Sequence, residues 1–115
     1  MRSVHIKLIN PRMNCRPSDA RLKFRLLPPQ SLLLLGGLTP DDHHVSVVDE
    51  NVCRDARIDD RPDLVGMPVF VATAKRAYRL ADAYRRRGVP VVLGGLHASL
   101  CPDEAKEHAD SVVVG

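Results

Sequence analysis

The stretch DLVGMPVFVATAKRAYRLADAYRRRGVPVVLGGL, residues 63–96, determines the fold class of this 115-residue chain. Its first part, residues 64–71, is a short apolar run of the kind found in buried strands. Residues 74–87 follow with apolar side chains three and four positions apart, which predicts a helix with one buried stripe. The stripe consists of Ala74, Ala77, Leu80, Ala81 and Tyr84.

The end of this stretch predicts a second strand and a ligand-binding site at one edge of the sheet. Gly88 and Pro90 end the helix, and residues 91–93 form another apolar run that stops at Gly94 and Gly95. Two buried strands joined by a helix indicate a right-handed parallel βαβ unit. Parallel sheets bind ligands at the carboxyl ends of their strands, and glycine there lets a ligand approach the backbone.

The flanking sequence predicts three more strands and two more helices. The expected strands are 4–9, 44–48 and 111–114, and the expected helices are 30–38 and 102–108. Residues 13–28 and 52–62 are expected to be connections. Alternating strands and helices predict one α/β domain over residues 1–115, an open, doubly wound parallel sheet with strand order 2-1-3-4-5. The final helix of such a domain is missing, so a partner domain or self-association is expected to cover strand five.

Composition excludes several function classes. Only two Tyr, two Phe and no Trp are present, and the net charge is +3, so no nucleic-acid platform is expected. No apolar run is long enough to span a membrane and no signal-peptide layout is visible, which predicts a cytoplasmic protein. Three widely spaced cysteines predict reduced thiols, and no histidine pair has metal-binding spacing, so no metal site is predicted.

Several segments, taken in order, resemble the N-terminal cobalamin (B12)-binding domain of B12-dependent radical SAM proteins. The resemblance covers nearly the whole chain and rests on LINP at 8–11, LTP at 38–40, VDEN at 48–51, DLVG at 63–66, VPVVLGGLH at 89–97, and PDEA at 102–105 with HADSVVVG at 108–115. It implies a flavodoxin-like domain that holds cobalamin against the carboxyl edge of the sheet.

The resemblance also implies which residues line the cofactor, at the ends of strands one to four. These residues are Asn10, Pro11, Asp49, Glu50, Val71, Ala72, Thr73, Gly94, Gly95, Leu96 and His97. Acidic and amide groups among them would hydrogen-bond the amide side chains of the corrin.

Three departures from related patterns limit this prediction. The D-x-H-x-x-G signature, which supplies a lower cobalt ligand in another cobalamin-binding class, is absent, so no protein ligand to cobalt is expected. Pro68 stands where the family commonly has a serine near the tail pocket. No C-x-x-x-C-x-x-C is present, so the iron–sulfur cluster and SAM would belong to an absent downstream domain, and the chain alone is not expected to be an enzyme.

The leading hypothesis is therefore a cobalamin-binding module detached or truncated from a radical SAM, methyltransferase-like enzyme. A ligand-free flavodoxin-like scaffold or interaction domain is one alternative. A receiver or nucleotide-binding module is another. A receiver needs acids at the ends of strands one and three and a lysine at the end of strand five, where this chain has Asn10 and Pro11, residues 69–71, and Gly115.

Overall fold

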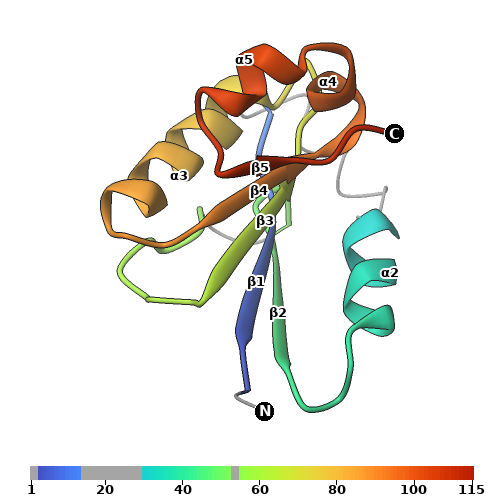
Figure 1. Ribbon diagram of the computed structural model, residues 1–115, viewed down its shortest axis with the longest axis vertical. Coiled ribbons are helices and arrows are strands. Elements are labelled where there is room, and N and C mark those ends of the chain that lie inside the picture. The colour runs from blue at the N-terminus through green and yellow to red at the C-terminus, as the bar shows by residue number, and fades with distance from the viewer. Residues whose placement is uncertain (1–2, 14–29, 53–54) are drawn as a thin grey trace.

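The computed structural model describes residues 3–13, 30–52 and 55–115, which form an α/β sandwich around one parallel sheet (Figure 1). Most of the expected connection 13–28 lies outside the described residues, as do Cys15 and Cys53. The described residues of the second expected connection, 52 and 55–62, contain no helix or strand, as predicted.

The sheet has the predicted strand order, β2-β1-β3-β4-β5, with every neighbouring pair parallel. Its strands are β1 (His5–Asn10), β2 (His44–Asp49), β3 (Leu64–Pro68), β4 (Val91–Gly94) and β5 (Ser111–Val112). The register places Asn10 opposite Asp49 and Pro68 opposite Gly94, so Asn10, Asp49 and Gly94 lie at the carboxyl edge of the sheet.

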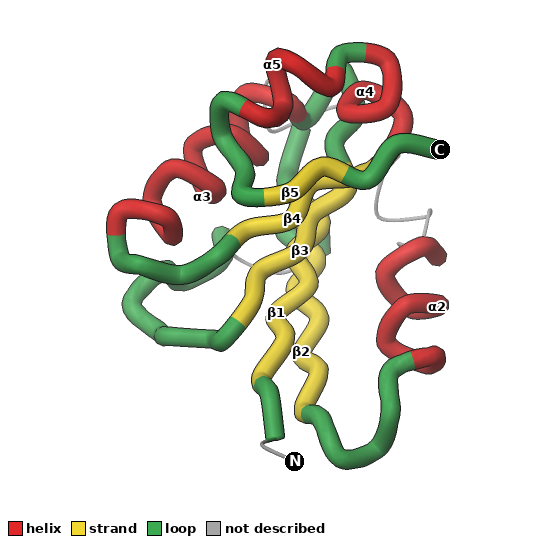
Figure 2. Tube along the Cα trace, in the orientation of Figure 1, coloured by secondary structure: helices red, strands yellow, loops and turns green. Residues whose placement is uncertain are grey.

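The helices cover the two faces of the sheet unequally (Figures 1 and 2). Helix α3 (Ala74–Arg86) packs on one face together with α4 (Gly95–Leu100) and α5 (Pro102–Lys106), whereas α2 (Gln30–Leu38) is the described helix on the other face. All five residues of the predicted α3 stripe are buried, which confirms the periodicity argument.

The main core lies between the sheet and α3. Ile9, Val65, Val91 and Leu93 are fully buried there against the α3 stripe, where Tyr84 is also fully buried. Alternate strand residues point to the α2 face, which holds Leu8 and Val92 and the single buried residue of α2, Leu32. One face of the sheet is therefore tightly packed and the other is only partly covered.

The segment after β3 differs from the prediction. The strand was expected to reach Val71 but ends at Pro68, and residues 95–100 form a helix, α4, that the sequence did not indicate. Proline has no N–H to donate at Pro68. Val69 instead accepts a hydrogen bond from the His97 N–H (2.9 Å) and donates one to the Gly94 carbonyl (2.7 Å), so the chain after β3 anchors the first turn of α4.

Candidate functional site

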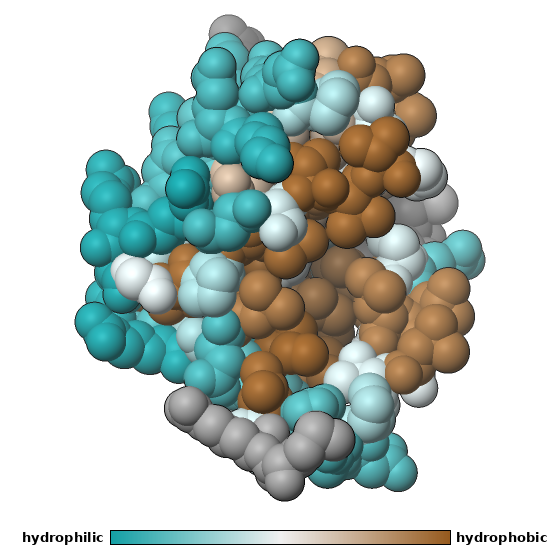
Figure 3. Space-filling view, in the orientation of Figure 1, coloured by the Kyte–Doolittle hydropathy of each residue, from teal (hydrophilic) through white to brown (hydrophobic). Residues whose placement is uncertain are grey.

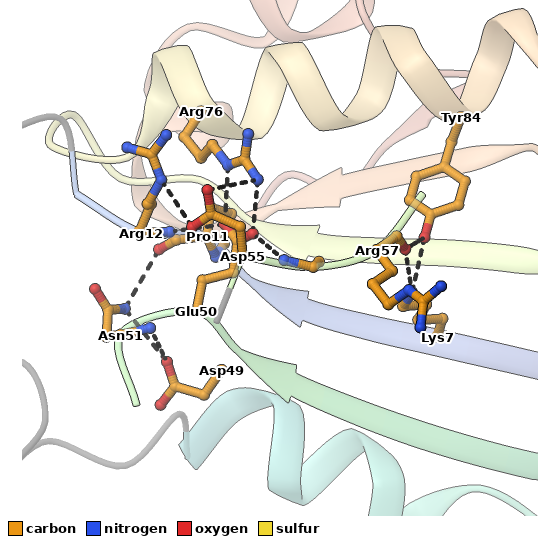
Figure 4. A network of polar contacts seen from close by, with 11 residues as sticks. Lys7, Pro11, Arg12, Asp49, Glu50, Asn51, Asp55, Arg57, Arg76 and Tyr84 are labelled. Carbon is orange, nitrogen blue, oxygen red and sulfur yellow. Dashed lines mark hydrogen bonds and ion pairs between the residues drawn. The ribbon is translucent and has the colours of Figure 1, made fainter. Parts of the chain in front are cut away.

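The carboxyl ends of β1 and β2 form a polar cluster that contains four predicted site residues. Asn10 Nδ2 donates to Asp49 Oδ1 over 3.1 Å. Asn51 Nδ2 donates to the Pro11 carbonyl over 3.4 Å, as Figure 4 shows. Asn10 and Asp49 are partly exposed, whereas Pro11 is buried. The Asn10 and Asp49 side chains are thus the members of this cluster that a ligand at the edge can reach.

The fourth residue, Glu50, is fully buried and holds three segments together. Its carboxylate accepts two hydrogen bonds from Arg76 of α3 (3.0 and 2.8 Å) and others from the Arg12 and Ala56 N–H groups. Burial acts to raise the pKa of Glu50, but these hydrogen bonds and the Arg76 charge outweigh it and hold the pKa below its ordinary value. With both oxygens engaged by the protein, Glu50 fixes the edge and does not face a ligand.

The turn between β3 and α3 carries three more predicted residues. Val71 is 80% exposed, Ala72 is partly exposed and Thr73 is buried. Thr73 Oγ1 accepts a hydrogen bond from the Phe70 N–H (3.1 Å), so its hydroxyl closes the turn. Val71 is therefore the most exposed of the three predicted residues.

Gly94 and Gly95 have different structural roles. Gly95 adopts φ +89°, and a Cβ there would lie 2.8 Å from Val69 N and 3.0 Å from Val69 O, so the backbone requires glycine. Gly94 has an extended backbone, and a Cβ there would meet Val113 at 3.8 Å, an ordinary contact. Gly94 therefore leaves space on the α2 face, whereas Gly95 allows α4 to pack against Val69.

An apolar hollow of about 310 Å³ lies between α2 and the carboxyl half of the sheet. Its lining residues are Leu8, Ser31, Leu32, Leu35, Gly66, Met67, Pro68, Phe70, Val92, Gly94, Gly95 and Val113. Figure 3 shows hydrophobic side chains gathered on this side of the molecule, between α2 and the sheet.

Gly66 in the middle of β3 was not predicted as a site residue. A Cβ at Gly66 would come within 3.0 Å of Leu8 Cδ2, so the absence of a side chain here deepens the hollow. A glycine inside a strand is the sequence signal for such a close approach. Pro68, which the sequence placed near the tail pocket, does line the hollow.

The last two predicted residues lie in α4. Leu96 is 62% exposed. The His97 ring contacts Glu104 of α5, with Nε2 and Oε2 2.7 Å apart, and His97 is not among the residues that line the hollow.

A second polar network, which the sequence did not reveal, lies on the α3 side away from the carboxyl edge. The ammonium of the buried Lys7 donates to Asp60 over 2.7 Å. It also donates to the Tyr84 hydroxyl (2.8 Å) and to the Arg57 carbonyl, which Figure 4 shows. Burial and the hydrogen bond to Asp60 raise the pKa of Tyr84. The Lys7 charge is neutralised within the protein, which indicates a structural role.

A doubly wound sheet with a glycine-lined apolar hollow and a polar rim at its carboxyl edge defines a small-molecule-binding domain. The chain belongs to the B12 binding domain family, which matches residues 25–115. This match confirms the resemblance found in the sequence and the flavodoxin-like fold that it implied.

Two methyltransferases of Chlorobaculum tepidum are similar to the chain. Bacteriochlorophyllide d C-8(2)-methyltransferase is 47% identical over 85 residues, which are 74% of this chain and 19% of that protein. Bacteriochlorophyllide d C-12(1)-methyltransferase is 38% identical over 53 residues, which are 46% of this chain and 12% of that protein. The chain thus matches about a fifth or less of each relative's length. No solved structure gives a significant match.

The described residues contain no candidate membrane span. No helix in that part of the chain is long and apolar enough to cross a bilayer.

Proposed function

We propose that this chain is a cobalamin-binding module that serves a radical SAM methyltransferase, with the nucleotide tail of cobalamin in the apolar hollow and the corrin ring at the carboxyl edge. The hollow carries the proposal: in a member of the B12 binding domain family, it opens where parallel sheets bind ligands. When bound, cobalamin would supply a cobalt centre that carries a methyl group.

The size and chemistry of the hollow fit the tail better than the whole cofactor. A volume of about 310 Å³ is at the lower end for small-molecule pockets, so the corrin ring would lie outside it. The tail ends in a flat, largely apolar base, which suits walls formed by Leu32, Phe70 and Val113. Ser31 is the hydroxyl-bearing side chain in the lining, since Pro68 brings none.

The polar rim is positioned to hold the corrin. Asn10 and Asp49 lie at the ends of adjacent strands and are partly exposed, so their amide and carboxylate groups are available to the corrin's amide side chains. Val71 and Ala72, which are exposed and partly exposed, lie beside this rim. Glu50 and Thr73 act indirectly by fixing this rim.

Catalysis would take place on another polypeptide region. The two similar proteins are methyltransferases much longer than the matched part, and this sequence has no cluster-binding cysteine motif. The iron–sulfur cluster, SAM and the reacting substrate would be held by that region. Exposed apolar side chains near β5, namely Leu96, Leu100, Val113 and Val114, support an additional partner surface on this side.

Titration with hydroxocobalamin, followed by desalting and a visible spectrum, tests the module. The wild-type chain is expected to retain about one equivalent of corrinoid. Gly94→Leu fills the floor of the hollow and is expected to weaken binding at least tenfold, about 1.4 kcal/mol. The matched control is Gly37→Leu, because a side chain at Gly37 in α2 meets no atom within 4 Å and lies outside the hollow.

Cobinamide, which lacks the nucleotide tail, separates the two parts of the proposal. Wild-type protein is expected to bind cobinamide more weakly than cobalamin, and Gly94→Leu should leave cobinamide binding unchanged. Circular dichroism would establish that each variant is folded. A folded wild-type chain that retains no corrinoid would refute the proposed function, and equal cobalamin binding by Gly94→Leu would refute the placement of the tail.

A further inference from the structure

Three side chains with metal-binding atoms meet at the junction between α4 and α5, outside the hollow. The ligand atoms of His97, Cys101 and Glu104 all lie within 4.8 Å of one another. None of the three residues lines the hollow, so this cluster is separate from the proposed tail site.

Local backbone structure explains why these residues converge. His97 and Cys101 are four residues apart, and the Cys101 N–H donates to the His97 carbonyl over 2.8 Å, which places both on one side of a helical turn. Pro102 then starts α5, and its first turn brings Glu104 back to the same side. The spacing of histidine pairs does not reveal this combination, because the other two ligands are a cysteine and a glutamate.

The cluster is held from several directions. The His97 backbone is tied to Val69 beyond β3 by a 2.9 Å hydrogen bond, and the His97 side chain is only 18% exposed. The Tyr78 hydroxyl of α3 donates to Glu104 Oε2 over 2.7 Å. Tyr78 in turn stacks on His108, with ring centroids 4.2 Å apart. Outer partners of this kind orient metal ligands and raise affinity.

We propose that His97, Cys101 and Glu104 bind a divalent transition-metal ion of the zinc type. Imidazole nitrogen, thiolate sulfur and carboxylate oxygen are all ligands of Zn²⁺, whereas Mg²⁺ and Ca²⁺ prefer oxygen alone. Three protein ligands leave a fourth tetrahedral position for water or a partner's side chain. On binding, the Cys101 thiol gives its proton to solvent as the sulfur–metal bond forms, and the metal replaces the contact between His97 and Glu104.

Cobalt(II) is the probe for this site, used with cobalamin-free protein under reducing, oxygen-free conditions. The background variant is Cys15→Ser/Cys53→Ser, in which Cys101 is the remaining thiol. Titration is expected to give one equivalent of Co²⁺ with a thiolate-to-cobalt charge-transfer band in the near ultraviolet. Added Zn²⁺ should abolish the band by displacing the cobalt.

Single substitutions assign the ligands. Cys101→Ser is expected to remove the charge-transfer band, and His97→Ala and Glu104→Ala should each weaken Co²⁺ binding at least tenfold. Tyr78→Phe, which removes only the outer hydroxyl, should weaken binding by about 10-fold or more. His44→Gln is the matched control, because His44 is an exposed histidine at the amino end of β2.

Two results would overturn the metal site. One is a folded background variant that shows no charge-transfer band with excess Co²⁺. The other is a band that survives Cys101→Ser or is unaffected by both His97→Ala and Glu104→Ala. Because cobalamin is absent from the assay, neither result bears on the proposed cobalamin function.

Discussion

Replacement of Gly95 by alanine is expected to lower the free energy of unfolding by about 2–5 kcal/mol. The left-handed backbone at φ +89° costs a residue with a side chain about 1–2 kcal/mol. The new methyl group would also press against the Val69 backbone at 2.8 and 3.0 Å, and overpacking of this kind costs about 1–3 kcal/mol. Urea unfolding followed by circular dichroism measures the loss.

Gly88→Ala is the matched control for this prediction. Gly88 has φ +80°, close to that of Gly95, but a Cβ there meets no atom within 4 Å. Gly88→Ala should therefore lower the free energy of unfolding only by the cost of the left-handed backbone, about 1–2 kcal/mol. Equal losses in the two variants would show that the close approach of α4 to Val69 contributes nothing.

Removal of the Glu50 carboxylate is expected to destabilise the domain by about 3–5 kcal/mol. Glu50→Ala leaves the largely buried Arg76 guanidinium without its main partner and strips hydrogen bonds from the Arg12 and Ala56 N–H groups. The control is Asp59→Ala, which breaks the exposed ion pair with Arg57 and should change stability by less than about 1 kcal/mol. Comparable losses in both variants would contradict a special role for the buried pair.

The lowered pKa of Glu50 also makes the stability of the domain depend on pH. The folded-state pKa of Glu50 lies below its ordinary value, so the stabilisation is fully present above the unfolded pKa and is lost as the pH falls through the folded pKa. Asp60, whose pKa is also lowered, acts in the same direction. Unfolding midpoints should stay level from neutral pH down to the unfolded carboxylate pKa and fall as the pH drops below it, and Glu50→Gln should make that fall shallower.

The fold could be predicted from the sequence because its signals are local. The α3 stripe and the apolar runs at β3 and β4 identify buried elements without knowledge of their neighbours. Helix α4 was missed because its position depends on Val69, some 26 residues earlier than Gly95, through a backbone contact that no periodicity reports. The β3 boundary was wrong because the apolar run continues to Val71, whereas the strand ends at Pro68, which has no N–H to donate.

The site could be predicted in outline but not in the roles of its members. Sequence reasoning grouped Asn10, Asp49 and Gly94 at one edge, and the register does bring Asn10 and Asp49 together. It could not show that the oxygens of Glu50 are occupied by Arg76, a residue 26 positions away. The roles of all the predicted lining residues toward cobalamin stay predictions.

If cobalamin binds in the hollow as proposed, the unequal covering of the sheet would link cofactor supply to the lifetime of the folded chain. Helix α2 is anchored by Leu32 alone among its buried residues, while the α3 face is fully packed. A ligand that fills the space beneath α2 would bind only the folded form, and mass action then adds about 2.7 kcal/mol of stability at a ligand concentration 100 times its Kd. Cells short of corrinoid would therefore hold a larger share of this domain in unfolded, protease-sensitive form, so that its abundance would follow cofactor availability.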